Sequence, residues 1–194
     1  DEYENLMDNQ RKRAKEASSF ESLLPSSIDL DKETDFLGYQ QDACEAQIRL
    51  IFKNGLEVEE VDSGEFLFIT DKTPFYAESG GQIGDSGFIK ADIGLAKVKD
   101  TQKTGGYFIH FAEVEKGSFK KSQNILMEIE TDKRKKIVSN HSATHLMHAS
   151  LRNILGKHVE QKGSLVNEEK LRFDFSHDKA LTKKEIIEIE NQVN

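Results

Sequence analysis

The sequence predicts an α+β fold: an N-terminal helix, then a small antiparallel β-barrel, then part of an α+β core. Three observations predict this order. Apolar side chains recur at roughly helical spacing among many charges over residues 1–20, and short apolar runs separated by Gly, Asp and Asn turns follow. Beyond these runs the helical spacing returns, followed by two strand-like runs and a last helix. We therefore divide the chain into residues 1–33, 34–130 and 131–194.

The composition is that of a soluble globular protein. Of 194 residues, 36% are hydrophobic and 32% are charged, and no apolar run approaches the ~20 residues that span a bilayer. No secretory signal opens the chain, and one cysteine argues against a disulfide framework, so we expect a cytoplasmic protein. The net charge of −8 is weak evidence against a general nucleic-acid binder, although residues 133–136 are all basic. That run is either a solvated helix face or a contact for phosphates.

The first part, residues 1–33, is expected to be a helix followed by a linker. Its apolar spacing is carried by Tyr3, Leu6, Ala14, Ala17 and Phe20. Serines and Pro25 then end the helix. The first residue is Asp1 rather than Met, and the charged helical pattern is already under way there. We therefore expect a piece of a longer protein.

The middle part, residues 34–130, is expected to form the barrel. Asn54-Gly55 and Asp62-Ser63-Gly64 are turn signals, because Asn and Gly tolerate positive φ. About seven short strands in one open sheet would expose its edges, and closing the sheet into a barrel removes them. Cys44, in the first run, is expected to pack as a small apolar side chain. The expected strands have the sequences CEAQIRLIF, LEVEEV, EFLFIT, GFIKA, LAKVKDTQ, YFIHFAEV and NILMEIE.

The last part, residues 131–194, opens with a long helical segment. We expect an interruption near Ser139-Asn140, and Gly156 is placed to end the helix. An apolar stripe along the helix is formed by Met147, Leu151 and Ile154.

Two strands and a second helix follow. The sequences KGSLV and LRFDFS are expected to pair through a turn at residues 167–170. Thr182 and Glu185 have the spacing of a capping box and predict the start of the last helix. The buried face of that helix is expected to comprise Ile186, Ile189 and Val193.

Three histidines in the long helix are spaced like part of a metal site. His141, His145 and His148 fall on one helix face at about 100° per residue. Two imidazoles at i and i+4 can bind one Zn²⁺. Ser142 stands where the metalloprotease motif needs Glu, so that motif is not present. Spacing alone leaves three alternatives: a polar helix face, a site with two histidine ligands, or a site with three.

Residues 73–88, TPFYAESGGQIGDSGF, form a glycine-rich loop with many polar side chains. Their spacing fits neither the dinucleotide motif G-x-G-x-x-G nor a phosphate loop ending in Gly-Lys-Ser/Thr. The glycines therefore serve either a tight barrel turn or a close approach of the backbone. Binding residues often lie in loops of this kind. The polar residues are Glu78, Ser79, Gln82 and Asp85.

The remaining polar candidates are weaker. Gln161 and Lys162 immediately precede a strand, which by itself indicates a surface turn. His110 and His177 are expected to be structural, because neither has a partner at metal-ligand spacing in the sequence.

Three stretches in this order resemble the editing half of alanyl-tRNA synthetase: residues 73–87, 140–166 and 171–177. Residues 3–20 resemble the helix that leads out of that family's tRNA-recognition region. The resemblance covers essentially the whole chain. It implies an exit helix, a β-barrel and the first part of an editing core. That core is similar to the editing domain of threonyl-tRNA synthetase and to the free-standing alanyl editing proteins.

The resemblance also implies roles for single residues. His141 and His145 match the family's zinc-binding histidines, and Thr144 matches the pocket residue that helps to sort serine from alanine. Gln161 matches a pocket glutamine that contacts the substrate, and His148 is expected beside the site without being a ligand. The family's other zinc ligands lie in a Cys-Gly-Gly-Thr-His segment further along. Zinc is therefore the expected cofactor, in a site that this chain would hold only in part.

The implied function is that of a proofreading region. The family uses ATP to attach alanine to its tRNA, at a site expected outside this chain. Binding differences of ~1–3 kcal/mol cannot exclude glycine and serine, so a second site hydrolyses the mischarged tRNA. The expected partner is the acceptor end of tRNA, with residues 133–136 near its phosphates, and neither DNA nor a membrane. The alternatives are a free-standing trans-editing hydrolase and a non-catalytic RNA-binding module that keeps the histidines without metal.

Overall fold

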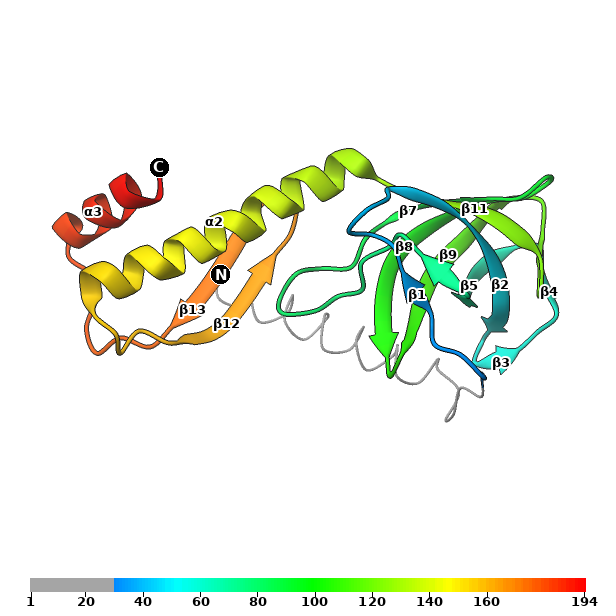
Figure 1. Ribbon diagram of the computed structural model, residues 1–194, viewed down its shortest axis with the longest axis horizontal. Coiled ribbons are helices and arrows are strands. Elements are labelled where there is room, and N and C mark those ends of the chain that lie inside the picture. The colour runs from blue at the N-terminus through cyan, green and yellow to red at the C-terminus, as the bar shows by residue number, and fades with distance from the viewer. Residues whose placement is uncertain (1–29) are drawn as a thin grey trace, which may run out of the picture.

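The computed structural model describes residues 30–194, so the helix expected over residues 1–20 lies outside the described residues. Figure 1 shows a barrel from which one long helix leads away, with a two-stranded hairpin beside that helix and a short helix at its far end. No helix within the described range is long and apolar enough to cross a membrane.

The barrel is a closed ring of antiparallel strands. Within residues 30–194, six strands form the ring in the order β11, β7, β8, β9, β5 and β2. β11 also pairs with β2, so Met127 has Ile89 as its partner on one side and Cys44 on the other. The predicted barrel is thus confirmed. Its strands are β2 (Ala43–Lys53), β5 (Gly64–Thr70), β7 (Gly87–Lys90), β8 (Leu95–Thr104), β9 (Tyr107–Lys116) and β11 (Asn124–Ile129).

One expected strand does not join the ring. The run LEVEEV is divided into β3 (Leu56–Glu57), which extends β2 as a hairpin, and β4 (Glu60–Val61), which pairs with β10 (Phe119–Lys120). A further short parallel pair joins β1 (Asp35–Phe36) to β6 (Lys72–Thr73). Asn54 and Gly55 have φ of 54° and 78°, as the predicted hairpin turn requires.

The barrel interior is filled by alternate side chains of its strands and by apolar residues of the segments between them. Phe68, Phe75 and Phe119 are fully buried, and each contributes roughly 1.5–3 kcal/mol through removal from water. Cys44 is 8% exposed within the same core, as expected for a small apolar residue, and burial raises the pKa of its thiol to about 11.

The long helix, α2 (Thr131–Leu155), is continuous over 25 residues, so the interruption expected near Ser139-Asn140 is wrong. Both polar side chains form hydrogen bonds that leave the helix intact. Ser139 Oγ donates to the Lys135 carbonyl at 3.1 Å, and Asn140 Nδ2 donates to the Asn167 carbonyl at 2.8 Å. Gly156, with φ of 120°, ends the helix as predicted, and its N–H donates to the Arg152 carbonyl.

The hairpin consists of β12 (Gln161–Val166) and β13 (Leu171–Phe175), and α3 (Lys183–Val193) follows it. Thr182 caps α3 through the predicted box: its N–H donates to Glu185 Oε2 at 2.7 Å, and its Oγ1 accepts from the Glu185 N–H. The expected buried face is confirmed only in part, because Ile189 is buried and Ile186 is 41% exposed. A second small core forms from Leu151, Val159 and Ile189, with Met147, Ile154, Phe173 and Val193 packed against it.

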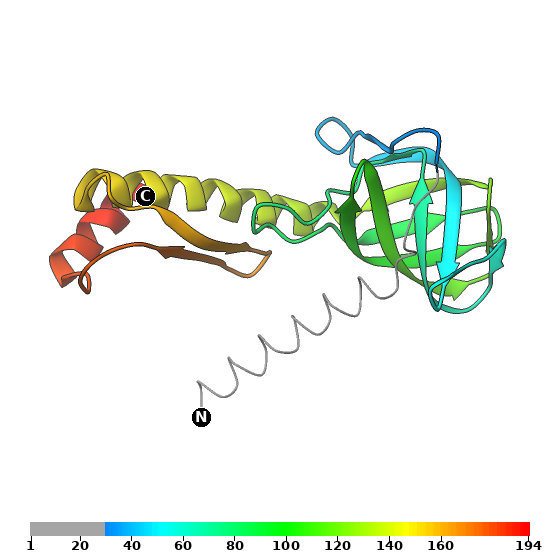
Figure 2. The same ribbon diagram turned by 90° about the horizontal axis from the view of Figure 1, so that it is seen from below.

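The loop between β6 and β7, residues 74–86, leaves the barrel and reaches the hairpin. Figures 1 and 2 show it extending from the barrel toward β12, alongside the first half of α2. The loop and the helix therefore both bridge the barrel and the hairpin, and the candidate site lies where they meet.

Candidate metal centre

His141 and His145 meet edge to edge on the surface of α2. Their Nε2 atoms lie 3.0 Å apart, and their ring centroids are 4.9 Å apart with the planes tilted by 49°. His145 is exposed and His141 is half-buried. The structure therefore brings together the two residues that the resemblance assigns to zinc, with one nitrogen of each aimed at the same point.

Gln82, from the barrel loop, contacts the other nitrogen of His141. Its Oε1 lies 2.8 Å from Nδ1, and the Gln82 side chain is itself buried. Because an amide oxygen only accepts hydrogen bonds, Nδ1 must carry the proton in this contact. In a neutral imidazole this leaves Nε2 with a free lone pair, directed toward His145. Sequence analysis marked the loop but missed this contact, since 59 residues separate the two partners.

The loop is fixed against β12 by backbone hydrogen bonds. The Val166 N–H donates to the Gly81 carbonyl at 2.7 Å, and the Ile83 N–H donates to the Val166 carbonyl at 3.1 Å. Gly81 has φ of +88°, and a Cβ there would lie 2.5 Å from the Ser164 carbonyl oxygen. Close approach of the backbone, one of the two roles expected for these glycines, is therefore the role of Gly81.

Thr144 is buried beside the histidine pair. Its Oγ1 donates to the Asn140 carbonyl at 2.8 Å, one helical turn earlier. The hydroxyl proton is thereby engaged, and the oxygen retains lone pairs that accept hydrogen bonds.

His148 does not join the other two histidines. Its ring lies against Phe173 of β13, with centroids 5.0 Å apart, and its Nε2 is buried with no hydrogen-bond partner. The alternative of a site with three histidines is therefore wrong for this structure. His148 belongs to the contact between helix and hairpin.

Gln161 lies apart from the pair. It is exposed at the first position of β12, opposite Phe175, whereas the end of β12 near His141 is Val166. Five steps along the strand separate the two ends, about 17 Å at ~3.3 Å per residue. The structure thus places Thr144 next to the histidines and Gln161 further along the hairpin.

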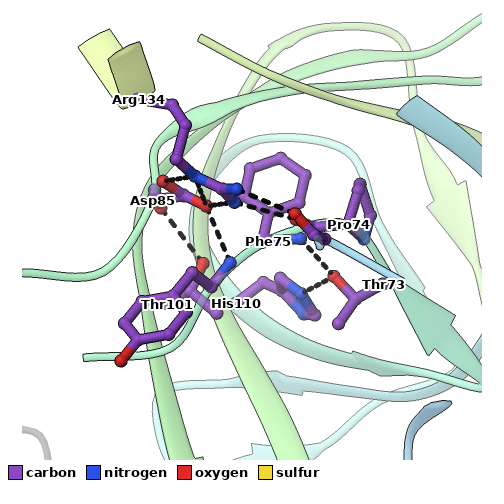
Figure 3. Close-up of polar contacts among 9 residues, drawn as sticks. Thr73, Pro74, Phe75, Asp85, Thr101, His110 and Arg134 are labelled. Atoms are coloured by element: carbon purple, nitrogen blue, oxygen red, sulfur yellow. Dashed lines mark hydrogen bonds and ion pairs between the residues drawn. The ribbon is translucent and has the colours of Figure 1, made fainter. Parts of the chain in front are cut away.

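Arg134 fixes the start of α2 to the barrel. Figure 3 shows its guanidinium between Asp85 and the carbonyl oxygen of Pro74. Its Nη1 also donates to the Gly38 carbonyl at 2.9 Å. Its Nε donates to both oxygens of the Asp85 carboxylate, at 2.9 and 3.0 Å, and its Nη2 contacts Asp85 as well. The two side chains are 14% and 3% exposed. Arg134 is therefore a buried structural residue, which corrects its assignment to a basic run near tRNA phosphates.

The neighbouring lysines also have acidic partners. Lys133 contacts Ser86 at 3.0 Å and Glu168 at 3.7 Å, and Lys135 pairs with Asp132 at 3.7 Å. An open hollow of about 450 Å³ at this end of the helix has a mixed lining of Glu130, Thr131, Asp132, Lys133, Lys136 and Glu168. Three acidic side chains and two lysines line it, so it is no concentrated phosphate site.

His110 is structural, as predicted. It is fully buried in the barrel, where its Nε2 contacts Thr73 Oγ1 at 2.8 Å (Figure 3). Its Nδ1 contacts the Phe68 carbonyl at 3.2 Å. Burial lowers the pKa of His110 to about 4, although the hydrogen bond to the Phe68 carbonyl favours the charged form.

His177 has a partner that its sequence spacing did not reveal. Its Nδ1 lies 2.9 Å from His158 Nε2, and the rings are stacked with centroids 5.1 Å apart. Asp178 lies 3.8 Å from the same Nδ1 but is 84% exposed. These three ligand-type side chains gather beyond the end of α2, although no metal-ligand spacing in the sequence joins them.

The His141–His145 pair fits a zinc ion by its chemistry. Imidazole nitrogens are common zinc ligands, and one of these two has its lone pair fixed by a hydrogen bond on the far side of the ring. Within residues 30–194, no further His, Cys, Asp or Glu atom joins the pair. Of the four ligands that a tetrahedral zinc takes, the pair could supply two.

Comparison with known proteins agrees with the resemblance. Residues 1–133 match the family described as tRNA synthetases class II (A). The alanine–tRNA ligase of Hydrogenovibrio crunogenus is 45% identical over 193 residues, which are 99% of this chain and 22% of that protein. That of Haemophilus influenzae is 46% identical, with the same coverage of both chains. That of Paracoccus denitrificans is 48% identical over 83% of this chain and 18% of its own length.

The chain thus spans about a fifth of the length of the curated relatives it matches. The family match covers well over half of its residues. The chain therefore belongs to the class II (A) tRNA synthetases, and it matches one segment of the alanine–tRNA ligases.

Proposed function

We propose that this chain forms part of the zinc-dependent editing site of an alanine–tRNA ligase. The editing reaction hydrolyses Ser-tRNA and Gly-tRNA that carry the alanine identity. The observation that carries the proposal is the 3.0 Å approach of His141 Nε2 and His145 Nε2, with the His141 tautomer fixed by Gln82. Bound zinc would supply Lewis-acid polarisation or orientation of the aminoacyl ester near a water.

Thr144 is suited to recognise serine. Because its proton is engaged by the Asn140 carbonyl, its oxygen can accept a hydrogen bond from the serine hydroxyl of a mischarged tRNA. Alanine has no hydroxyl to donate. A pocket with a polar partner for a hydroxyl discriminates against a ligand that lacks one. Gln161 would contact the substrate further along the hairpin, on the exposed start of β12.

The remaining functions belong to the whole protein. ATP-dependent alanylation of tRNA would take place outside this chain, which covers about a fifth of its relatives. The acceptor end of tRNA is the proposed partner of the site. Of the basic run, only Lys136 has neither an ion pair nor a side-chain hydrogen bond within the described residues, so phosphate contacts would depend on it and on other parts of the protein. A cytoplasmic location stays a prediction.

The test is metal content and deacylation in a longer chain that carries the next Cys and His residues. We expect that chain to bind zinc and hydrolyse Ser-tRNA, and His145→Ala to abolish both. The 194-residue chain should retain zinc weakly or not at all, because it supplies two of four ligands. The matched control is His148→Asn, which alters a histidine on the same face without touching the pair and should keep both properties.

Two results would overturn the proposal. Undiminished hydrolysis by His145→Ala would remove the metal role. Tight stoichiometric zinc in the 194-residue chain would show that its ligand set is already complete.

A further inference from the structure

We infer that Gln82 is a positioning residue, which delivers a hydrogen-bond acceptor from the barrel to fix the tautomer of His141 for metal binding. The inference rests on the proposed zinc site and extends it to a residue of another part of the fold. It also assigns a function to the glycine-rich loop, which contributes no proposed zinc ligand.

The first step is the direction of the hydrogen bond. Gln82 Oε1 lies 2.8 Å from His141 Nδ1, and oxygen can only accept there. His141 is therefore held as the Nδ1–H tautomer, with its lone pair on Nε2. Free imidazole side chains favour the opposite tautomer, so the contact reverses the intrinsic preference.

The second step is the consequence for His145. Its Nε2 lies 3.0 Å from His141 Nε2, which has a lone pair, so the hydrogen between them belongs to His145. When a cation binds between the two Nε2 atoms, the His145 proton must move from Nε2 to Nδ1. Because the His145 ring is exposed, the Nδ1–H group can then donate a hydrogen bond to water. Only one of the two ligands then needs to change tautomer, because Gln82 has set the other in advance.

The third step is the rigidity of the support. Gln82 is buried, and its backbone forms reciprocal hydrogen bonds with Ser79 at 3.0 and 3.1 Å. The residues on either side of it, Gly81 and Ile83, are bonded to Val166 of β12. The Gln82 side-chain amide therefore cannot move away from His141 unless the backbone hydrogen bonds between the loop and Val166 break. A second contact of this kind, behind a metal-binding histidine, is typical of metal sites, and its loss weakens metal affinity by about 10–100-fold.

The test compares Gln82→Leu with Gln82→Glu. Leucine removes the acceptor at similar size, whereas glutamate keeps an oxygen at the same position. Long-range ¹H–¹⁵N spectra of the imidazoles in the chain itself should show His141 as Nδ1–H in the parent and in Gln82→Glu. In Gln82→Leu they should show mainly Nε2–H.

Metal titration of the longer chain with Co²⁺ and Zn²⁺ provides the second measurement. We expect affinity to fall 10–100-fold in Gln82→Leu and to stay within a few-fold of the parent in Gln82→Glu. A purely structural role for Gln82 would lower the thermal stability of the variants without changing the tautomer. Parent-like tautomer and affinity in Gln82→Leu would overturn the inference.

The two proposals fail separately. If the longer parent chain binds no metal, the editing proposal is wrong, while the spectra of the metal-free chain still decide whether Gln82 sets the tautomer. If the parent binds metal and edits but the Gln82→Leu spectra match those of the parent, only the positioning role is lost.

Discussion

The histidines of this chain have different surroundings, and His110 is the one enclosed by the barrel core. His110 lies wholly inside the barrel, in contact with Thr73 and the Phe68 carbonyl, and burial lowers its pKa from 6.5 to about 4. His141 and His145 lie at the helix surface, where a ligand can reach them. Buried histidine without a carboxylate partner is a structural residue that resists protonation.

This resistance predicts a pH-dependent stability. Between pH 6.5 and 4 the unfolded chain binds a proton at His110 and the folded chain does not, so the free energy of unfolding falls as pH falls through that window. The loss should reach about 2.5 kcal/mol at pH 4.5, from 1.36 kcal/mol per pKa unit. Urea unfolding of the parent and of His110→Gln at pH 7 and 4.5 measures it. An equal pH dependence in both proteins would contradict the assignment.

At this scale the sequence predicted that His141 and His145 share a helix face, but not the contact of Gln82 with His141. The i, i+4 spacing of His141 and His145 follows from helix geometry alone, and the structure confirms their approach. The contact of Gln82 with His141 joins a loop to a helix across the fold, and no local pattern encodes it. The neighbour of His177 was missed for the same reason, since His158 reaches it only when the hairpin folds back.

Among the elements, the glycine-rich loop owes its path to one close backbone contact. Gly80 and Gly81 both have positive φ, at 61° and 88°, but only Gly81 has a neighbour that a Cβ would strike. The pair therefore provides an internal control.

We expect Gly80→Ala to lower stability by about 1 kcal/mol, the cost of a left-handed conformation. Gly81→Ala should cost at least twice as much, because its Cβ would meet the Ser164 carbonyl, and it should displace Gln82 from His141. Urea unfolding gives the stability, and the His141 tautomer reports the displacement. Equal losses of stability in the two variants would show that β12 shifts to accommodate the added Cβ of Gly81→Ala at little cost in free energy.

The elements themselves were largely predictable because their signals are local. Short apolar runs between Gly, Asp and Asn turns predicted the barrel strands, and Thr182 with Glu185 predicted the start of α3. The expected break at Ser139-Asn140 failed because both side chains have partners that leave the backbone helical, one of them on the distant Asn167. The run LEVEEV failed as one strand because its two halves pair with different neighbours.

In the molecule as a whole, a buried ion pair joins the barrel to the helix. Arg134 and Asp85 lie 49 residues apart, and each also contacts the backbone at the start of the loop at residues 74–86. Arg134 donates to the Pro74 carbonyl, and Asp85 accepts from the Tyr76 N–H at 2.7 Å. Removing one partner leaves the charge of the other buried without an opposite charge beside it. This typically costs 3–5 kcal/mol, about the range expected for Arg134→Met here.

A double-mutant cycle tests this pair. Arg134→Met combined with Asp85→Asn should cost clearly less than the sum of the single variants, since neither charge then remains buried alone. Lys135→Met is the control, because its pair with Asp132 is exposed on both sides and should contribute nothing measurable. Additive costs for Arg134 and Asp85 would show that the two do not act as a pair.

The distance between Arg134 and His141 along α2 equals the distance that three extended residues span. Seven helical residues rise about 10.5 Å. The loop from Asp85 back to Gln82 covers about 10 Å when extended. The loop segment thus matches the helix segment in length, with one end at the ion pair and the other at the imidazole of His141. One added residue between Ile83 and Gly84 would lengthen it by about 3.4 Å, more than two helical rises, so both ends could no longer engage together.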